Sequence, residues 1–597
     1  MKTVAVDTEY DYEGPFLATV TDDQLQTRVF RLKEEKERKE LAKIVENPSI
    51  RKVFHHAVAD IYKLSQIGMK VVRPYECTLI LSNLVNEQFS SRNLKELAKA
   101  HLGIETKEAN RLNALIKKYK ERAKKEGREF RWSEIPDEYI IPYAKRDTEY
   151  TIKLWFYWQE PLKQVKVLYE FEKSLIPIIV KMQKRGMGID RYLVLKTIQQ
   201  YERKLVELET QIKQITEGLG VKDFNIRSVP QLRLVLEKLG VQTTRDPKTG
   251  ELSTSKVSLQ SVNHPFIDLV LRYRFFKKHL STYYSPLYFH YTSPTNSRAH
   301  FMLYQTGAKT GRFSAELIQT FPRPEEAKVA GERHEVRKVV IPKKGYVILC
   351  KDYEQQEMRL FIHYSNCKRM IDIINGKGGR GIDCYEETAK ILFGKLYREP
   401  YSKPLRYIAK QCSLGMIYGE GQRKLIDTVI AYLNSKFDRE VIEKIGVSER
   451  WARQVLDAYY RLYPVKPFMQ QKIAEVYKTG VLKMSFDSPL MKFSRVYHVP
   501  HEFAYRAVNM LIQGTAAYII KSAMLRIDRR LKKENLHKQV RMLMQVHDEL
   551  IFEVHESLDI KEVDGILSEE MEDHVTFKVP ITTSMKWSKV SWGDVTD

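Results

Sequence analysis

Short β-branched runs alternate with helical segments over the first 160 residues. The run KTVAVDTE at 2–9 ends in carboxylates, and VFRL near 29–32 and KVVR near 70–73 also have the composition of short strands. This alternation predicts an α/β unit. From about Glu160 to Ile215 apolar residues recur every three or four positions, as in LVELETQIKQI, which predicts an arm of long helices.

The pattern changes again after this helical arm. A turn-rich piece, TTRDPKTGELSTS, occupies 243–255, and the basic, aromatic run RYRFFKKHLSTYY follows at 272–284. Such a run can hold a phosphate backbone, but alone it more often forms a packed amphipathic helix with a solvated basic face. Beyond 300, YVILCKDYE and RMLMQVHDELIFEV read as buried strands that carry acids, with mostly helical chain between them.

Length and charge narrow the class of protein. A chain of 597 residues is long enough for several domains with large cores. Lys and Arg number 100 against 76 Asp and Glu, a net charge of +24, which suits a polyanion partner such as nucleic acid. An ordinary basic enzyme is an equally good explanation of the charge alone.

Cysteine usage and the N-terminus indicate a compartment. The five cysteines form no CxxC pair, so neither a zinc site nor a disulfide framework is predicted, and a reducing environment fits best. We find no signal-like N-terminus and no stretch that could span a bilayer. We therefore expect no membrane partner and a cytoplasmic location, or the host cytoplasm if the protein is viral; an organelle is also compatible.

Four acids and a tyrosine near the N-terminus have a spacing that suits metal binding. Asp7 and Glu9 lie two apart on a predicted strand, so both side chains leave the same face. Asp60 follows the strand-like VFHHAV, and Asp147 follows Tyr143 by one helical turn. Hard oxygen ligands suit Mg²⁺ or Mn²⁺, and two such ions can activate water for phosphodiester hydrolysis. Each piece is commonplace, but the ordered set is a much stronger signal than any one piece.

A second pair of carboxylates comes from segments about two hundred residues apart. Asp352 ends an apolar strand, with Glu357 at the start of the next predicted helix. Asp548 and Glu549 fall at a turn between two apolar strands. If the segments pair in one sheet, Asp352 and Asp548 can bridge two Mg²⁺ ions. One ion would lower the pKa of a primer 3'-hydroxyl, and the other would bind a triphosphate and its leaving pyrophosphate.

A helix face in PLRYIAKQCSLGMIYGEG accompanies this pair. Arg406, Lys410, Leu414 and Tyr418 recur every four residues and therefore share one face. Two cations suit triphosphate oxygens, and the ring suits a base or sugar. A solvated basic helix is the simpler interpretation, but it leaves the ring on the same face unexplained.

With these residues in view, the chain resembles two known families. The N-terminal acids and Tyr143 resemble the three motifs of DEDDy 3'-5' exonucleases. DYEQQEMR, RYIAKQCSLGMIYG and QVHDEL look like motifs A, B and C of family A DNA polymerases, the bacterial polymerase I type, and they occur in that order. Further matches are TGRFS at 310–314, IQGTAA at 512–517 and FNIRS at 224–228.

The resemblance implies a multidomain α/β architecture. A ribonuclease H-like 3'-5' exonuclease domain would be followed by a right-hand polymerase domain, and because no segment precedes the exonuclease motifs, a 5'-nuclease domain is expected to be absent. The implied boundaries are 1–160 for the exonuclease, 161–597 for the polymerase, about 165–285 for the helical thumb, about 286–395 and 530–597 for the antiparallel-sheet palm, and about 396–529 for the helical fingers.

The resemblance also implies metal ligands in both domains. Tyr143 would orient the attacking water of the exonuclease, and Asp352 and Asp548 would be the catalytic metal-binding pair of the polymerase. The exonuclease metal ligands would be Asp7, Glu9, Asp60 and Asp147.

Roles in binding nucleotide and DNA follow in the same way. Arg406 and Lys410 would contact the triphosphate, with Lys410 a candidate acid for the leaving pyrophosphate. Tyr418 would stack at the template or nucleotide position, and Glu357 beside it would act as a steric gate against ribonucleotides. The residues that would read the minor groove near the primer end, where acceptors are similar for every base pair, are Arg312, Gln513 and His547.

Several positions depart from the family pattern. Leu414 stands among the nucleotide-binding residues where Phe or Tyr is usual, so discrimination at the sugar 3'-position does not carry over. Glu354 and Gln356 replace small and aliphatic residues, and Tyr518 follows GTAA where Asp is usual. HHA at 55–57 stands where the exonuclease family often has Asn.

The expected partners are primer–template DNA and deoxynucleoside triphosphates, with two Mg²⁺ ions per active site, or Mn²⁺ in their place, in a monomer. Three other classes compete with this interpretation. A 3'-5' exonuclease whose C-terminal half only binds DNA would not need Asp352, Asp548, Arg406 and Lys410. A single-subunit RNA polymerase would need neither Glu357 nor a proofreading-like domain, and a purely structural nucleic-acid-binding protein would not need two carboxylate clusters. Whether the role is replication or repair stays open.

Overall fold

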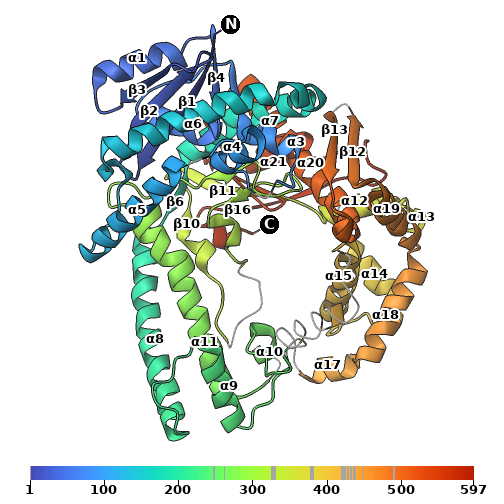
Figure 1. Cartoon of the computed structure of the whole chain (residues 1–597). Helices are drawn as coiled ribbons and strands as arrows, with labels where there is room; N and C mark the ends of the chain where they lie inside the picture. The colour runs from blue at the N-terminus through green and yellow to red at the C-terminus, as the bar shows by residue number, and fades with distance from the viewer. Residues whose placement is uncertain are drawn as a thin grey trace.

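The computed structural model shows two groups of helices projecting from the same side of a body that contains a five-stranded and a four-stranded β-sheet (Figure 1). Among the described residues, every helix is too short or too polar to cross a lipid bilayer. The structure describes all residues except 1, 90, 106, 246–248, 261, 324–330, 377–381, 419–424, 427–428, 430–432, 434–438, 447, 489–490, 574 and 597.

The first 80 residues build a five-stranded mixed sheet in the order β3-β2-β1-β4-β5. Strand β1 is antiparallel to β2 and parallel to β4. Helix α2, at Ala57–Gln66, and helix α6, at Asp137–Tyr157, contact this sheet. The strands are β1 at Lys2–Asp11, β2 at Gly14–Asp22, β3 at Thr27–Arg31, β4 at Ile50–Phe54 and β5 at Tyr75–Cys77.

The prediction of a strand at KVVR, 70–73, is wrong. These residues lie in the connection between α2 and β5, and the edge strand begins only at Tyr75. Strand β4 offers β5 three paired positions, from Lys52 to Phe54, so only residues 75–77 enter the ladder. Four more helices complete this domain: α1 at Glu35–Val45, α3 at Thr78–Val85, α4 at Leu94–Leu102 and α5 at Lys107–Lys125.

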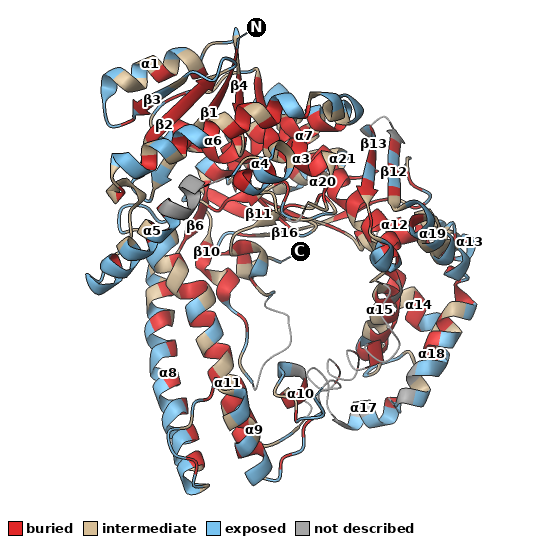
Figure 2. Ribbon diagram, viewed as in Figure 1, coloured by how far each residue is buried: buried red, intermediate tan, exposed pale blue. Residues whose placement is uncertain are grey.

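Long helices follow the first domain, as the apolar spacing predicts. Helix α7, at Gln159–Arg185, packs against α2 and α3 of the first domain and against α20 of the second. The projecting arm that Figure 1 shows below it contains α8 at Arg191–Gly218, α9 at Val229–Lys238, α10 at Lys256–Gln260 and α11 at Pro265–His279. Helix α8 is largely exposed except for one buried stripe, whereas about half of the residues of α11 are buried (Figure 2).

The basic, aromatic run at 272–284 spans the end of α11 and the turn after it. Tyr273, Phe275 and Phe276 are buried, whereas Lys278 is exposed. The run is therefore a packed amphipathic helix, the simpler of the two interpretations. Its exposed basic side nevertheless borders a cavity described below.

A four-stranded antiparallel sheet, ordered β14-β15-β11-β16, lies at the centre of the second domain. The two acidic segments do pair in one sheet, because β11 and β15 are neighbours. The strands are β11 at Tyr346–Tyr353, β14 at Val540–Val546, β15 at Glu549–His555 and β16 at Thr583–Ser588. The flanking helices are α12 at Gln356–Ser365, α20 at Ala507–Lys533 and α21 at Ile560–Met571.

The second helical group lies opposite the arm (Figure 1). It is followed by a hairpin of strands β12 and β13, which packs against α20 and α7. The described elements of this part are α13 at Lys368–Asn375, α14 at Cys384–Phe393, α15 at Ser402–Tyr418, α17 at Arg439–Ile445, α18 at Glu449–Leu462, α19 at Lys466–Thr479, β12 at Val481–Ser488 and β13 at Met491–His498.

Candidate active sites

Three of the four predicted N-terminal acids meet at one point. Asp7 and Glu9 leave β1 on the same side, and Asp147 reaches them from α6. One carboxylate oxygen from each lies within 4.8 Å of the other two. Because hard oxygen ligands suit divalent cations, this donor set fits a Mg²⁺-type ion.

Asp60 approaches the same strand from α2 but is held separately. Its Oδ1 accepts hydrogen bonds from the backbone N–H of Thr8 at 3.1 Å and from the Thr8 hydroxyl at 2.7 Å. It is buried and lies outside the group of three carboxylates that share one point. Its negative charge still contributes to the site, because it raises the pKa of Asp7.

Sequence reasoning missed Lys95 in this site. Its ammonium group donates a hydrogen bond to Oδ1 of Asp147 and lies 3.7 Å from the ring centroid of Tyr143. Only 11% of each side chain of the Lys95–Asp147 pair is exposed. Asn93 caps α4 and fixes this turn by accepting the N–H of Lys95 at 3.0 Å. No sequence period links Lys95 to Asp147, which lies 52 residues away.

The electrostatics of this cluster favour a bound cation. Burial, with the neighbouring Asp60, Glu9 and Asp147, raises the pKa of Asp7. Burial raises the pKa of Glu9 to about 8 and that of Asp60 to about 7. Acids that lie this close together repel one another and are stabilised either by protons or by a positive ion, and Lys95 supplies only one charge.

The second pair of acids is brought together by the central sheet. Asp352, on β11, lies directly opposite Glu549 of β15. Asp548 is in the turn between β14 and β15, next to His547, whose φ is +57°. The backbone N–H of Tyr353 donates to the carbonyl of Asp548 at 3.2 Å, which holds this turn beside the end of β11.

Asp352 has the features of a cation ligand. Its Oδ1 is buried and has no hydrogen-bond partner, while Oδ2 lies 3.4 Å from the guanidinium of Arg323. Burial, then Asp548 and Glu549, raises its pKa, against the opposite effect of Arg323. Glu549 already has a hydrogen-bond donor, because its carboxylate accepts the indole N–H of Trp592 at 3.1 Å. A buried carboxylate oxygen without a partner is costly, so the residues present fit a divalent cation at Asp352.

The predicted basic face lies on helix α15, at Ser402–Tyr418. Arg406, Lys410, Leu414 and Tyr418 are partly exposed, and most residues between them are buried. The Nε of Arg406 donates to Oδ2 of Asp383 at 2.5 Å. Burial, together with Arg406 and Arg323, lowers the pKa of Lys410.

Glu357 links two of the other predicted binding residues. Its carboxylate accepts the hydroxyl of Tyr418 at 2.6 Å and pairs with the guanidinium of Arg312. Gln513, on α20, is close enough to Tyr418 to lower the pKa of its hydroxyl. Burial, with the charge of Glu357, raises the pKa of Tyr418, so its hydroxyl stays protonated and donates.

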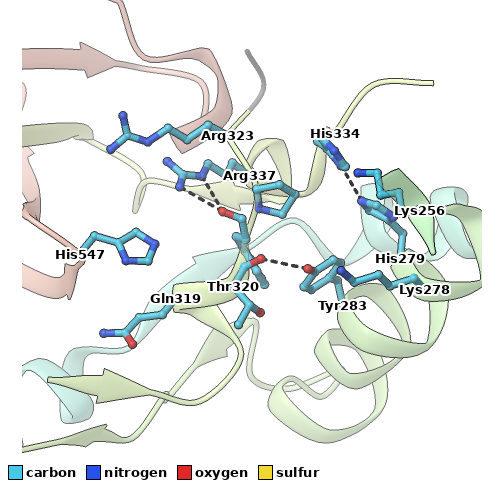
Figure 3. A pocket seen from close by; sticks show the side chains of 12 residues that line it. Lys256, Lys278, His279, Tyr283, Gln319, Thr320, Arg323, His334, Arg337 and His547 are labelled. Carbon is cyan, nitrogen blue, oxygen red and sulfur yellow. Dashed lines mark hydrogen bonds between the residues drawn. The ribbon is translucent and has the colours of Figure 1, made fainter. Parts of the chain in front are cut away.

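Two cavities share Gln319 and His547 in their linings. A cavity of about 50 Å³ brings Arg312 and His547 together. A larger cavity of about 290 Å³ lies between the arm and the central sheet. In Figure 3 Lys256 and Lys278 border it on the side of the arm, and Arg323 and His547 on the opposite side. Its lining is rich in cationic side chains, as binding of a polyanion requires.

Comparisons with known proteins show which families the chain is related to. A family model described as "DNA polymerase family A" matches residues 192–594, and one described as "3'-5' exonuclease" matches residues 1–162. DNA polymerase I of Caldicellulosiruptor bescii is 30% identical, over 72% of this chain and 48% of the relative. DNA polymerase I of Pseudomonas aeruginosa is 27% identical, over 88% of this chain and 55% of the relative.

The chain thus spans about half the length of the curated relatives that it matches. A solved structure, the POL domain of Pol1 from M. smegmatis in complex with DNA primer–template and dNTP, has the same fold. It is 22% identical with a TM-score of 0.75, and the match covers 99% of this chain and 96% of that one. The chain therefore belongs to DNA polymerase family A, with a 3'-5' exonuclease domain in front of its polymerase domain.

Proposed function

We propose that this chain copies a DNA template by transferring nucleotides from deoxynucleoside triphosphates to a primer 3'-hydroxyl. The observation that carries the proposal is Asp352, whose buried oxygen lacks a partner beside the Asp548 turn. In this proposal the two aspartates hold two Mg²⁺ ions, for which Mn²⁺ can substitute. Such ions lower the pKa of an attacking hydroxyl and stabilise a leaving pyrophosphate.

The nucleotide would lie against α15. Arg406 and Lys410 would bind its phosphate oxygens, and Arg406 would exchange Asp383 for the triphosphate as it does so. The lowered pKa of Lys410 suits a group that gives its proton to the pyrophosphate. Tyr418 and Leu414 would face the base and sugar. Glu357, held by the Tyr418 hydroxyl, would crowd the 2'-position of a ribonucleotide.

Primer–template DNA would lie between the two helical groups of Figure 1, against the cavity of Figure 3. Arg312, Gln513 and His547 would contact the minor groove at the primer end. The polymerase domain would be 161–597, with a thumb at about 165–285, a palm at about 286–395 and 530–597, and fingers at about 396–529.

The N-terminal domain, at about 1–160, would remove nucleotides from a primer 3' end. Asp7, Glu9 and Asp147 would bind the metal, with Asp60 completing the negative site. Tyr143, one helical turn before Asp147, would orient the attacking water. Proofreading follows if a mismatched 3' end reaches this site before the next nucleotide is added.

Extension of a 5'-labelled primer on a DNA template with Mg²⁺ tests the proposal. Full-length product with deoxynucleotides, and a shortening ladder without them, is the expected result. Shortening in both reactions would favour the alternative, an exonuclease whose C-terminal half only binds DNA. Extension without any shortening would mean that the N-terminal acids do not form a working nuclease.

A further inference from the structure

A buried arginine on the β12–β13 hairpin joins both catalytic domains. Arg495 is on β13 and is only 3% exposed. Its Nη1 donates to the hydroxyl of Tyr518, and its Nη2 lies 3.3 Å from Oδ1 of Asn83 in the exonuclease domain. The same Nη2 lies 3.4 Å from the carbonyl of Lys309. One guanidinium therefore contacts three segments that are far apart in the sequence.

The segment at 309–311 directly precedes Arg312 and is shaped by this contact. Gly311 has a φ of +87°, and a Cβ at this glycine would lie 2.6 Å from Nη1 of Arg495. The guanidinium thus packs directly against the backbone. The hydroxyl of Tyr497, two residues further along β13, donates to the carbonyl of Thr310 at 3.0 Å. Two side chains of one strand therefore bind two consecutive carbonyls of this segment.

Residues just after α3 of the exonuclease domain also contact this region. Lys309 donates to Oε1 of Gln88 at 2.6 Å. The backbone N–H of His498 donates to the buried carboxylate of Glu87 at 2.6 Å. The position of the 309–311 segment is consequently set from two sides.

We infer that Arg495 is a positioning residue that places Arg312 for the polymerase reaction. Only a guanidinium offers several donors in a fixed plane, so it can bind Tyr518, Asn83 and the Lys309 carbonyl together. Tyr518, which stands where the family usually has Asp, supplies one of these acceptors. Arg312 itself is held by Glu357, so a displaced segment would pull the arginine away from the primer end. The inference rests on the proposed polymerase function.

A double-mutant cycle with Arg495→Gln and Arg312→Ala tests it. Each single change is expected to lower kcat/KM for extension of a matched primer roughly tenfold or more. If Arg495 acts through Arg312, the double variant loses little beyond the larger single loss, because the second change removes an interaction already lost. Losses that multiply in the double variant would overturn the inference.

The matched control is Lys173→Met. Lys173 is another buried cation that ties the two domains, because it donates to Oε2 of Glu76 at 2.9 Å, but it does not touch the 309–311 segment. This variant should lose thermal stability while extension stays within about twofold of the wild type. An equal loss of extension in Lys173→Met would show a general structural role for such ties and would contradict the inference.

A milder variant covers the case in which Arg495→Gln does not fold. Tyr497→Phe removes only the hydroxyl that binds the Thr310 carbonyl, and its cycle with Arg312→Ala should be non-additive in the same way. Additive losses there would overturn the inference as well. If the wild type shortens single-stranded DNA but extends no primer, the proposed function fails; if it extends and the cycles are additive, only this inference fails.

Discussion

The two clusters of carboxylates balance their charge in different ways. In the N-terminal cluster three acids converge within 4.8 Å, and a nearly buried ammonium group, that of Lys95, already binds Asp147. At the end of β11, Asp352 pairs with Arg323, whose side chain is 44% exposed, and the other Asp352 oxygen has no hydrogen-bond partner among the described residues.

This difference bears on what each site needs from a metal ion. At Asp352 screening by solvent weakens the arginine, so a divalent ion would supply most of the missing positive charge. At Asp147 an incoming ion has to share or displace the ammonium of Lys95. We therefore expect the N-terminal site to bind a divalent cation more weakly, relative to the number of its carboxylates, than the site at Asp352.

The largest expected effect is on synthesis. Asp352→Asn removes the charge but keeps the size, and should lower primer extension at least about a thousandfold. Shortening of single-stranded DNA by the same variant should match the wild type, because the acids of the proposed nuclease site lie in the N-terminal domain. Loss of both activities would contradict the separation of the two sites.

The reciprocal change should act on shortening alone. Asp7→Asn with Glu9→Gln removes two of the three converging charges and should lower release of 3' nucleotides by roughly a hundredfold or more. Primer extension with deoxynucleotides, measured in the same preparation, should be unchanged. A parallel fall in extension would mean that the two clusters serve one reaction.

Lys95→Met sharpens the comparison of charge balance. Removing the competing ammonium should raise Mn²⁺ affinity of the N-terminal site about tenfold, which corresponds to ~1.4 kcal/mol. Calorimetric titration would measure this in a protein that also carries Asp352→Asn and Asp548→Asn, so that the second site stays silent. Weaker Mn²⁺ binding in Lys95→Met would show that Lys95 assists the ion.

The smallest expected effect concerns stability and pH. Burial raises the pKa of Glu9 to about 8, so between about pH 4.5 and 8 the folded state binds more protons than the unfolded state. Stability of the metal-free protein therefore falls as pH rises through this window. Glu9→Gln should remove that loss and stabilise the protein at pH 8.5 by on the order of 1 kcal/mol, with little change at pH 5.

Thermal unfolding in a chelating buffer at both pH values would measure this difference. Addition of Mg²⁺ should reduce it, because a bound ion stabilises the ionised carboxylate. Equal unfolding temperatures for Glu9→Gln and the wild type at pH 8.5 would contradict the raised pKa.

Several features of the fold and the sites could be predicted from local sequence alone. The alternating run at 2–9 and the acids at the β14–β15 turn could be assigned because side-chain direction on a strand depends only on neighbouring residues. The four-residue spacing from Arg406 to Tyr418 placed these residues on one face for the same reason. The same local logic misread KVVR, since its composition suits a strand but β4 offers it no partner positions.

Only the tertiary structure decided which charges meet. Lys95 and Asp147 are 52 residues apart, and Arg495 meets Asn83 across 412 residues, distances over which no sequence period carries information. It likewise placed Asp60 against Thr8 instead of among the three converging acids. Sequence determined which residues could bind a cation or a phosphate. Packing of separate elements determined which of them are buried together, and burial is what makes their charges interact strongly.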